Sequence, residues 1–105
     1  MSAPGLDAAL AALPPRAAPV EVIGGGPLAR ALREWLSSQL ATSGERPAAI
    51  IETTGDADAI REALAHVDEL GTVVLAGPPP EAGVALDLYA DLHVRGLTLV
   101  GTPGR

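Results

Sequence analysis

The chain of 105 residues contains no cysteine, no lysine and no phenylalanine. Without cysteine it forms no disulfide, no thiolate nucleophile and no cysteine-ligated zinc site. Without lysine it has neither Schiff-base chemistry nor a lysine general base. Tryptophan and tyrosine occur once each, so the core must be built from leucine, valine, isoleucine and alanine.

Positive charge is also scarce, and the formal net charge is −6. A surface that binds nucleic acid irrespective of sequence needs a basic face, so nucleic acid is not an expected partner. No stretch approaches the roughly 20 apolar residues of a membrane span, and no basic segment precedes an apolar run at the N-terminus. We therefore expect a cytoplasmic protein that does not associate with a membrane.

The length fits one domain preceded by a short N-terminal segment. Leucines at helical spacing from Leu6 to Leu13 lie in an alanine-rich stretch that stops at Pro14-Pro15. We expect residues 1–19 to form a helix and a proline-rich linker, and residues 20–105 to form the domain. The helix either covers the core of the domain, which we favour, or binds a partner.

The central feature is a strand, a glycine turn and a helix in direct succession. The β-branched run at 20–23 predicts the strand, three glycines follow, and Pro27 suits the first turn of a helix. Apolar residues at helical spacing predict one buried stripe, formed by Leu28, Leu32, Trp35, Leu36 and Leu40. This order is typical of a phosphate-binding turn at a helix N-terminus.

Strands and helices alternate along the rest of the chain. Further strands are expected at 48–52, 72–76 and 97–101, and Thr54 or Asp56 is expected to cap the helix after the first of them. The inward face of that helix is expected to comprise Ile60, Ala63, Leu64, Val67 and Leu70. The alternation predicts an α/β fold with about four mainly parallel strands and helices on both faces.

Two parts of the sequence resemble one family. The family pattern G-x-G-P-[LI]-[GA] after the first strand is matched by Gly24, Gly26, Pro27, Leu28 and Ala29. Downstream, IIETTGDADAIREALAHVDELGTVVLAGPPPE and VALDLYADLHVRGLTLVGTP are similar to the last three strands and their connections. Most of the chain thus resembles the nucleotide-binding domain of the medium-chain, zinc-type alcohol dehydrogenase superfamily, which implies a shortened Rossmann-like sheet.

The resemblance implies NAD or NADP as the candidate cofactor at the carboxyl ends of the strands. In the family, a second strand ends in an acid that binds the adenosine ribose, but here residues 37–47 lead directly into a strand resembling the family's fourth. At most residual nucleotide or phosphate binding is therefore expected; otherwise the glycines form only a tight turn. The cofactor-binding residues implied are Gly24, Gly25, Gly26, Leu28, Thr53, Thr54, Gly55 and Gly77.

Loss of the second and third family strands raises a question of handedness. If the helix after the glycines keeps its usual face, the connection from 20–23 to 48–52 becomes a left-handed crossover, which is rare. Three arrangements avoid it: the helix changes face, strand 48–52 takes the vacated place in an order 2-1-3-4, or the helix is exchanged between two copies. The sequence does not choose among them.

No residue set predicts catalysis or a metal site. His66 lies four residues after Glu62 on a helix face expected to be exposed, and His93 lies beside Asp91 in a short turn. With two histidines and no cysteine, the family's zinc site cannot be built, and its catalytic domain has no counterpart in these residues. We therefore predict no catalytic and no metal-ligating residue.

In the resembled family, the last strand joins two sheets across a dimer. An apolar, uncharged edge strand needs a partner or a cover. We expect an isologous homodimer, and the alternative is a monomer whose N-terminal segment covers this strand. The interface residues would be Leu97, Thr98, Leu99, Val100 and Gly101.

Three functions remain open. The first, which we favour, is a non-catalytic, dehydrogenase-like Rossmann remnant acting as an accessory or assembly protein, with an enzyme as a candidate partner. The second is an NAD(P)-dependent oxidoreductase subunit that a partner chain completes along the exposed flank of the first strand. The third is an enzyme of new chemistry that uses a pocket at the strand ends, with Thr53, Thr54 or His93.

Overall fold

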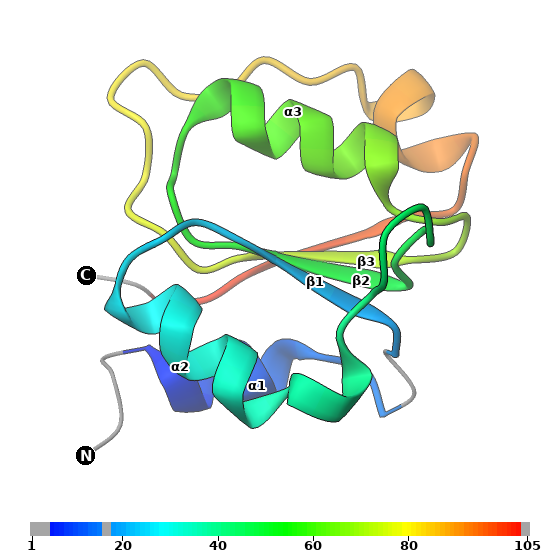
Figure 1. Ribbon diagram of the computed structural model, residues 1–105. Helices are drawn as coiled ribbons and strands as arrows, with labels where there is room; N and C mark the ends of the chain where they lie inside the picture. Colours follow the sequence, from blue (N-terminus) through cyan, green and yellow to red (C-terminus); the bar gives the residue numbers. More distant parts are fainter. Residues whose placement is uncertain (1–4, 16–17, 104–105) are drawn as a thin grey trace.

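The computed structural model describes residues 5–15 and 18–103, which form a parallel four-stranded sheet with helices on both faces (Figure 1). The predicted α/β class is therefore confirmed. The strands follow the sheet in chain order: β1 (Val20–Ile23), β2 (Ala49–Glu52), β3 (Thr72–Leu75) and β4 (Thr98–Gly101). The helical elements are α1 (Leu6–Ala12), α2 (Pro27–Trp35), the 3-10 turn η1 (Ser37–Gln39), α3 (Ala57–His66) and the π-helical turn η2 (Leu88–His93).

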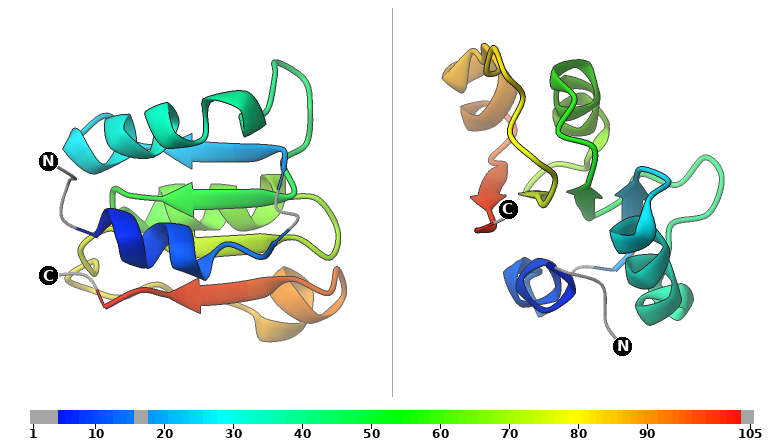
Figure 2. Two further views of the ribbon diagram at one scale, coloured as in Figure 1. Left: turned by 90° about the horizontal axis from the view of Figure 1, so that it is seen from below. Right: turned by 90° about the vertical axis from the view of Figure 1, so that its left-hand side faces the viewer.

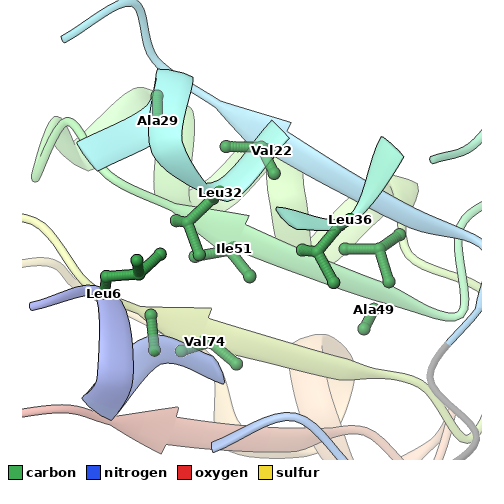
Figure 3. Packing of buried hydrophobic residues seen from close by; sticks show 10 residues of the cluster. Leu6, Val22, Ala29, Leu32, Leu36, Ala49, Ile51 and Val74 are labelled. Atoms are coloured by element: carbon green, nitrogen blue, oxygen red, sulfur yellow. The ribbon is translucent and has the colours of Figure 1, made fainter. Parts of the chain in front are cut away.

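The core has two apolar layers because successive side chains of a strand point to opposite faces of the sheet. Ile51 and Val74 point toward α1 and α2, where their neighbours include Leu32 (Figure 3). Ile50 and Val73 point the other way, toward α3. All four residues of β2 are buried, as expected for a parallel strand covered on both faces.

The crossover between β1 and β2 is left-handed. The chain moves in one direction from β1 through β2 to β3, yet α2 and α3 lie on opposite faces of the sheet, so their crossovers have opposite hands (Figure 2). Seen from the α2 side with the strands pointing upward, β2 lies to the left of β1. Two of the three arrangements predicted to avoid this crossover, the change of face by the helix and the strand order 2-1-3-4, are therefore wrong. Exchange of the helix between two copies stays a prediction.

Burial explains why α2 keeps this face. The apolar side of α2 covers Val22 and Ile51, which point away from α3, and α3 already occupies the opposite face above Ile50 and Val73. Moving α2 to that face would leave its partners in the sheet exposed to water, at a cost of about 1.5–3 kcal/mol for each large apolar side chain. The rare handedness thus follows from the apolar pattern of the strands.

Two residues predicted to face the core are exposed instead. Trp35 is 67% exposed, because the buried side of α2 centres on Ala29, Leu32 and Leu36, about 90° around the helix from Trp35. Leu70 is 82% exposed because α3 ends at His66 and Leu70 lies in the following turn, with a φ of 61°. The other predicted inward residues of α3 are buried.

The N-terminal helix belongs to the core of the sheet. Leu6 and Ala9 of α1 are buried in the same apolar layer as α2, and α1 contacts both α2 and β3. The interpretation that this helix covers the domain's own core is therefore confirmed. In the described residues, no helix is long and apolar enough to cross a bilayer.

Both ends of α3 are closed by side chains. At its start, the Asp56 carboxylate accepts a hydrogen bond from the Ala59 amide at 3.0 Å, which confirms one of the two predicted caps. At its end, Arg46 donates to the carbonyls of Ala65 and His66. Arg95 donates to the carbonyls of Leu64 and Val67, so two arginines satisfy the last four carbonyls of the helix.

Candidate functional site

The loops after β1 and β2 meet at the carboxyl edge of the sheet. The Thr53 amide and hydroxyl both donate to the Ile23 carbonyl, at 3.0 and 2.6 Å. Gly24 lies directly against the Thr53 hydroxyl, where a Cβ would collide with it, and has a φ of 124°. Gly24 is therefore required by the backbone of the turn, and the Thr53 hydroxyl is bound within the protein.

The loop after β3 closes on the loop after β2 in the same way. A Cβ on Gly55 would collide with the carbonyl oxygen of Pro78, and a Cβ on Gly77 would lie 2.6 Å from the Gly55 nitrogen and the Thr53 oxygen. The structure thus brings together the predicted residues Gly24, Thr53, Gly55 and Gly77. Their close contacts are with one another.

A buried carboxylate organises these loops, and sequence reasoning missed it. Glu52 ends β2 and is 1% exposed. It accepts hydrogen bonds from the Thr54 amide at 2.9 Å, the Thr54 hydroxyl at 2.5 Å and the Gly55 amide at 2.7 Å. The one available signal was an acid that ends an otherwise apolar strand immediately before Thr-Thr-Gly.

The start of α2 remains open. A Cβ on Gly25 or Gly26 would meet nothing within 4 Å, and no side chain caps the helix N-terminus. The predicted residue Leu28 differs from these glycines, because its side chain is half-buried against the core. This turn has room for a phosphate, so it fits that part of a nucleotide.

The flank of β1 is closed by the chain's own groups. Hydrogen bonds from Ala49 to Pro19, just before β1, and from Thr53 to Ile23 show that these two carbonyls face β2. By alternation, the carbonyls of Val20, Val22 and Gly24 face outward. The Ala41 amide donates to Val20 at 2.8 Å. The Arg33 guanidinium donates from Nη2 to Val22 at 2.8 Å and to Gly24 at 2.6 Å.

The closed flank of β1 occupies the place where the ribose half of a dinucleotide site would lie. In the resembled family the ribose-binding acid ends the strand that would lie on this flank. Here the flank holds a guanidinium and the segment around Leu40, which forms a bridge with Val20. The ribose half of NAD or NADP therefore does not fit the residues present.

A cavity of about 500 Å³ lies on the α3 side of the sheet, at the carboxyl ends of β2, β3 and β4. Part of its lining comes from the connection from β3 to η2, which includes Pro78, Pro79 and Pro80. Figure 1 draws this connection in yellow. The cavity's lining is mostly apolar, and Glu52 is the one charged residue that the described part of the chain contributes to it. It is a concave apolar site of the size that small ligands occupy.

Catalytic groups do not converge on this cavity. Of the three residues named for a new chemistry, Thr53 and Thr54 are bonded as described above. His93 lies on η2, packs edge-on against Tyr89 with ring centroids 5.6 Å apart, and is not part of the cavity lining. His66 is half exposed, with Nε2 3.5 Å from the Glu21 carboxylate. Among the described residues, no three potential metal ligands cluster.

The predicted dimer strand lies at the far edge of the sheet from β1. The amides of Thr98 and Thr102 donate to Gly71 and Leu75, so by alternation the backbone groups of Leu99 and Gly101 face outward. Thr98 and Gly101 are exposed, while Leu97, Leu99 and Val100 are half-buried.

Comparisons with known proteins support the fold. No protein-family model and no curated protein matches the sequence. Among solved structures, the 2R,3R-butanediol dehydrogenase of Bacillus subtilis matches with a TM-score of 0.79 at 16% identity, over 95% of this chain and 40% of that one. A protein described as a zinc-binding dehydrogenase (gutB) from Clostridium scindens matches with a TM-score of 0.71 at 15% identity, over 95% of this chain and 39% of that one. The chain thus spans about two fifths of each dehydrogenase, and the predicted resemblance is confirmed at the level of the Rossmann-like fold.

Proposed function

We propose that this chain is a non-catalytic, dehydrogenase-like Rossmann module, a pseudoenzyme that acts in the cytoplasm through assembly. One observation carries the proposal: the polar groups at the carboxyl edge are bonded to one another. Thr53 bonds to Ile23, and Thr54 and Gly55 bond to Glu52. These are the loops with which Rossmann-type enzymes hold a dinucleotide.

The positions of the arginines support the same proposal. Arg33, Arg46 and Arg95 donate to backbone carbonyls, and Arg61 pairs with Asp58 and donates to Ala85. Within the described part of the chain, Arg30 alone makes no such bond. Little positive charge is left to attract the pyrophosphate of a dinucleotide, and the net charge of −6 repels it.

A nucleotide titration tests this part of the proposal. We expect NADH, NADPH and ADP to cause no saturable change in thermal stability or in calorimetry at millimolar concentration. A weak effect shared by ADP and inorganic phosphate would fit residual phosphate binding at Gly25 and Gly26. A response specific to NADH or NADPH would contradict the proposal and favour an oxidoreductase.

The assembly we propose is a homodimer that pairs β4 with its two-fold mate. The outward backbone groups of Leu99 and Gly101 lie along an uncharged edge, and α1 lies over β3, away from that edge (Figure 2). On the opposite face of the sheet from α1, η2 lies over β4 and exposes Leu88 and Tyr89, at 64% and 73%. An enzyme partner would bind this dimer.

Substitution at the edge tests the dimer. Gly101→Pro removes an outward-facing amide, and a Cβ at this position meets nothing within 4 Å. By light scattering we expect a dimer for the wild type and for the control Gly101→Ala, and a monomer for Gly101→Pro. A monomeric wild type at micromolar concentration would overturn this part of the proposal.

A further inference from the structure

We propose that the cavity on the α3 side binds a small apolar ligand that carries one cationic or neutral hydrogen-bond donor, and that it rejects anions. The proposal concerns a site separate from the open start of α2, which lies on the other face of the sheet. It rests on the volume of the cavity, the chemistry of its walls and the hydrogen-bonding capacity that remains on one buried carboxylate.

The walls come from four parts of the fold. Ile60 of α3, Leu75 of β3 and Leu99 of β4 form the inner surface, and Val84 and Leu86 of the connection to η2 face them. The cavity of about 500 Å³ lies within the range of small-molecule sites, which are mostly apolar with a few placed polar groups. An apolar body of one or two rings fits this description.

Glu52 supplies the placed polar group. Its Oε2 accepts two hydrogen bonds, from the amide and the hydroxyl of Thr54, but its Oε1 accepts one, from the Gly55 amide. A carboxylate oxygen accommodates about two donors, so Oε1 has capacity for one more. A ligand donor at the wall of the cavity would complete this set.

The charge of the cavity sets the selectivity. All three donors to Glu52 are neutral groups, and among the described residues no arginine or histidine lines the cavity. Arg61 on α3 pairs with Asp58 at 3.2 Å and donates to the Ala85 carbonyl, and it is not one of the lining residues. An anion would therefore meet an uncompensated negative charge in a partly desolvated place, whereas an ammonium group would be attracted to it.

Three matched ligands test the proposal. Benzylamine, benzyl alcohol and benzoate share an aromatic ring and are cationic, neutral and anionic at pH 7. Titrated into the 15N-labelled full chain, benzylamine and benzyl alcohol should shift the amide signals of Gly55, Val84 and Thr102. We expect benzoate to bind at least ten times more weakly than benzylamine. Equal binding of benzoate, or no shift from any of the three ligands at millimolar concentration, would overturn the proposal.

Two variants locate the ligand. Val84→Phe fills the cavity from the connecting loop, and Ala82→Phe places the same ring on an exposed residue of that loop outside the lining. We expect the first to reduce benzylamine affinity at least tenfold and the second to leave it unchanged. Glu52→Gln, provided that it folds, should reduce the preference for benzylamine over benzoate to less than threefold. Retained binding in Val84→Phe would place the ligand elsewhere and refute the proposal.

Discussion

Arg33 closes the outer edge of β1 with its side chain, so its replacement should destabilise the protein. Its guanidinium makes two hydrogen bonds to the outer carbonyls of β1, at 2.8 Å to Val22 and 2.6 Å to Gly24. A hydrogen bond to a charged group contributes about 1.5–3 kcal/mol, and the arginine is half-buried, so solvent reduces the sum. We predict that Arg33→Ala lowers the free energy of unfolding by about 2 kcal/mol.

The control lies one turn earlier on the same helix. The Arg30 side chain is exposed and makes no hydrogen bond to the described residues, so Arg30→Ala removes the same charge from α2 without opening β1. Surface substitutions of this kind change stability by about 0.5 kcal/mol or less. Comparing the two variants cancels the effect of net charge and of the alanine itself.

Urea and thermal denaturation at one protein concentration measure the difference, because an assembling protein has a concentration-dependent melting temperature. A loss of about 2 kcal/mol corresponds to a melting temperature lower by roughly 10 °C for a domain of this size. If Arg33→Ala and Arg30→Ala agree within about 0.5 kcal/mol, the guanidinium does not hold the edge of β1, and the reasoning is refuted.

Three further variants test individual contacts by urea denaturation, each against a matched control where the chain offers one. Gly24→Ala should lower the free energy of unfolding by about 2–3 kcal/mol, because Gly24 has a positive φ and the new Cβ would collide with the Thr53 hydroxyl. Gly25→Ala should leave the stability nearly unchanged, and equal losses in the two variants would contradict the tight turn. Asp56→Ala should lower the free energy of unfolding by about 1 kcal/mol, because the helix cap is lost. Asp58→Ala should lower it by less than about 0.5 kcal/mol, since its ion pair is exposed. Equal effects of the two variants would show that the Asp56 cap does not stabilise α3. Arg95→Ala should cost about 2 kcal/mol by releasing two carbonyls at the end of α3, and an unchanged stability would show that water replaces them.

Local pattern was sufficient to predict the elements of the fold. The apolar runs predicted all four strands, and the 3.6-residue spacing predicted α2 and α3. Asp56 was one of two predicted caps, because capping depends on residues three apart. The error at Trp35 arose because this residue lies to one side of the buried face of α2, and the error at Leu70 arose because α3 ends before it. A periodic sequence shows which face is apolar, but it does not show where the last turn stops.

Contacts between residues far apart in the sequence could not be predicted from local sequence pattern. Arg33 and Arg95 each donate to backbone carbonyls of another element, and Arg95 reaches 28 and 31 residues back along the chain. Glu52 ends an apolar strand in the sequence, and in the structure it fixes the loop that was predicted to hold a cofactor. Residue type and spacing do not show which groups satisfy one another in the folded chain.

The short connection between β1 and β2 accounts for both the unusual crossover and the closed edge. With no strand inserted after α2, the chain must return directly to β2, and the apolar side chains of β1 and β2 hold α2 on the face that makes this return left-handed. The same short return brings Leu40 and Ala41 alongside Val20, while α2 places Arg33 next to Val22 and Gly24. A partner chain that completed an oxidoreductase at this flank would have to displace all of these groups. The edge at β4 is therefore the side on which this sheet can grow without first breaking its own hydrogen bonds.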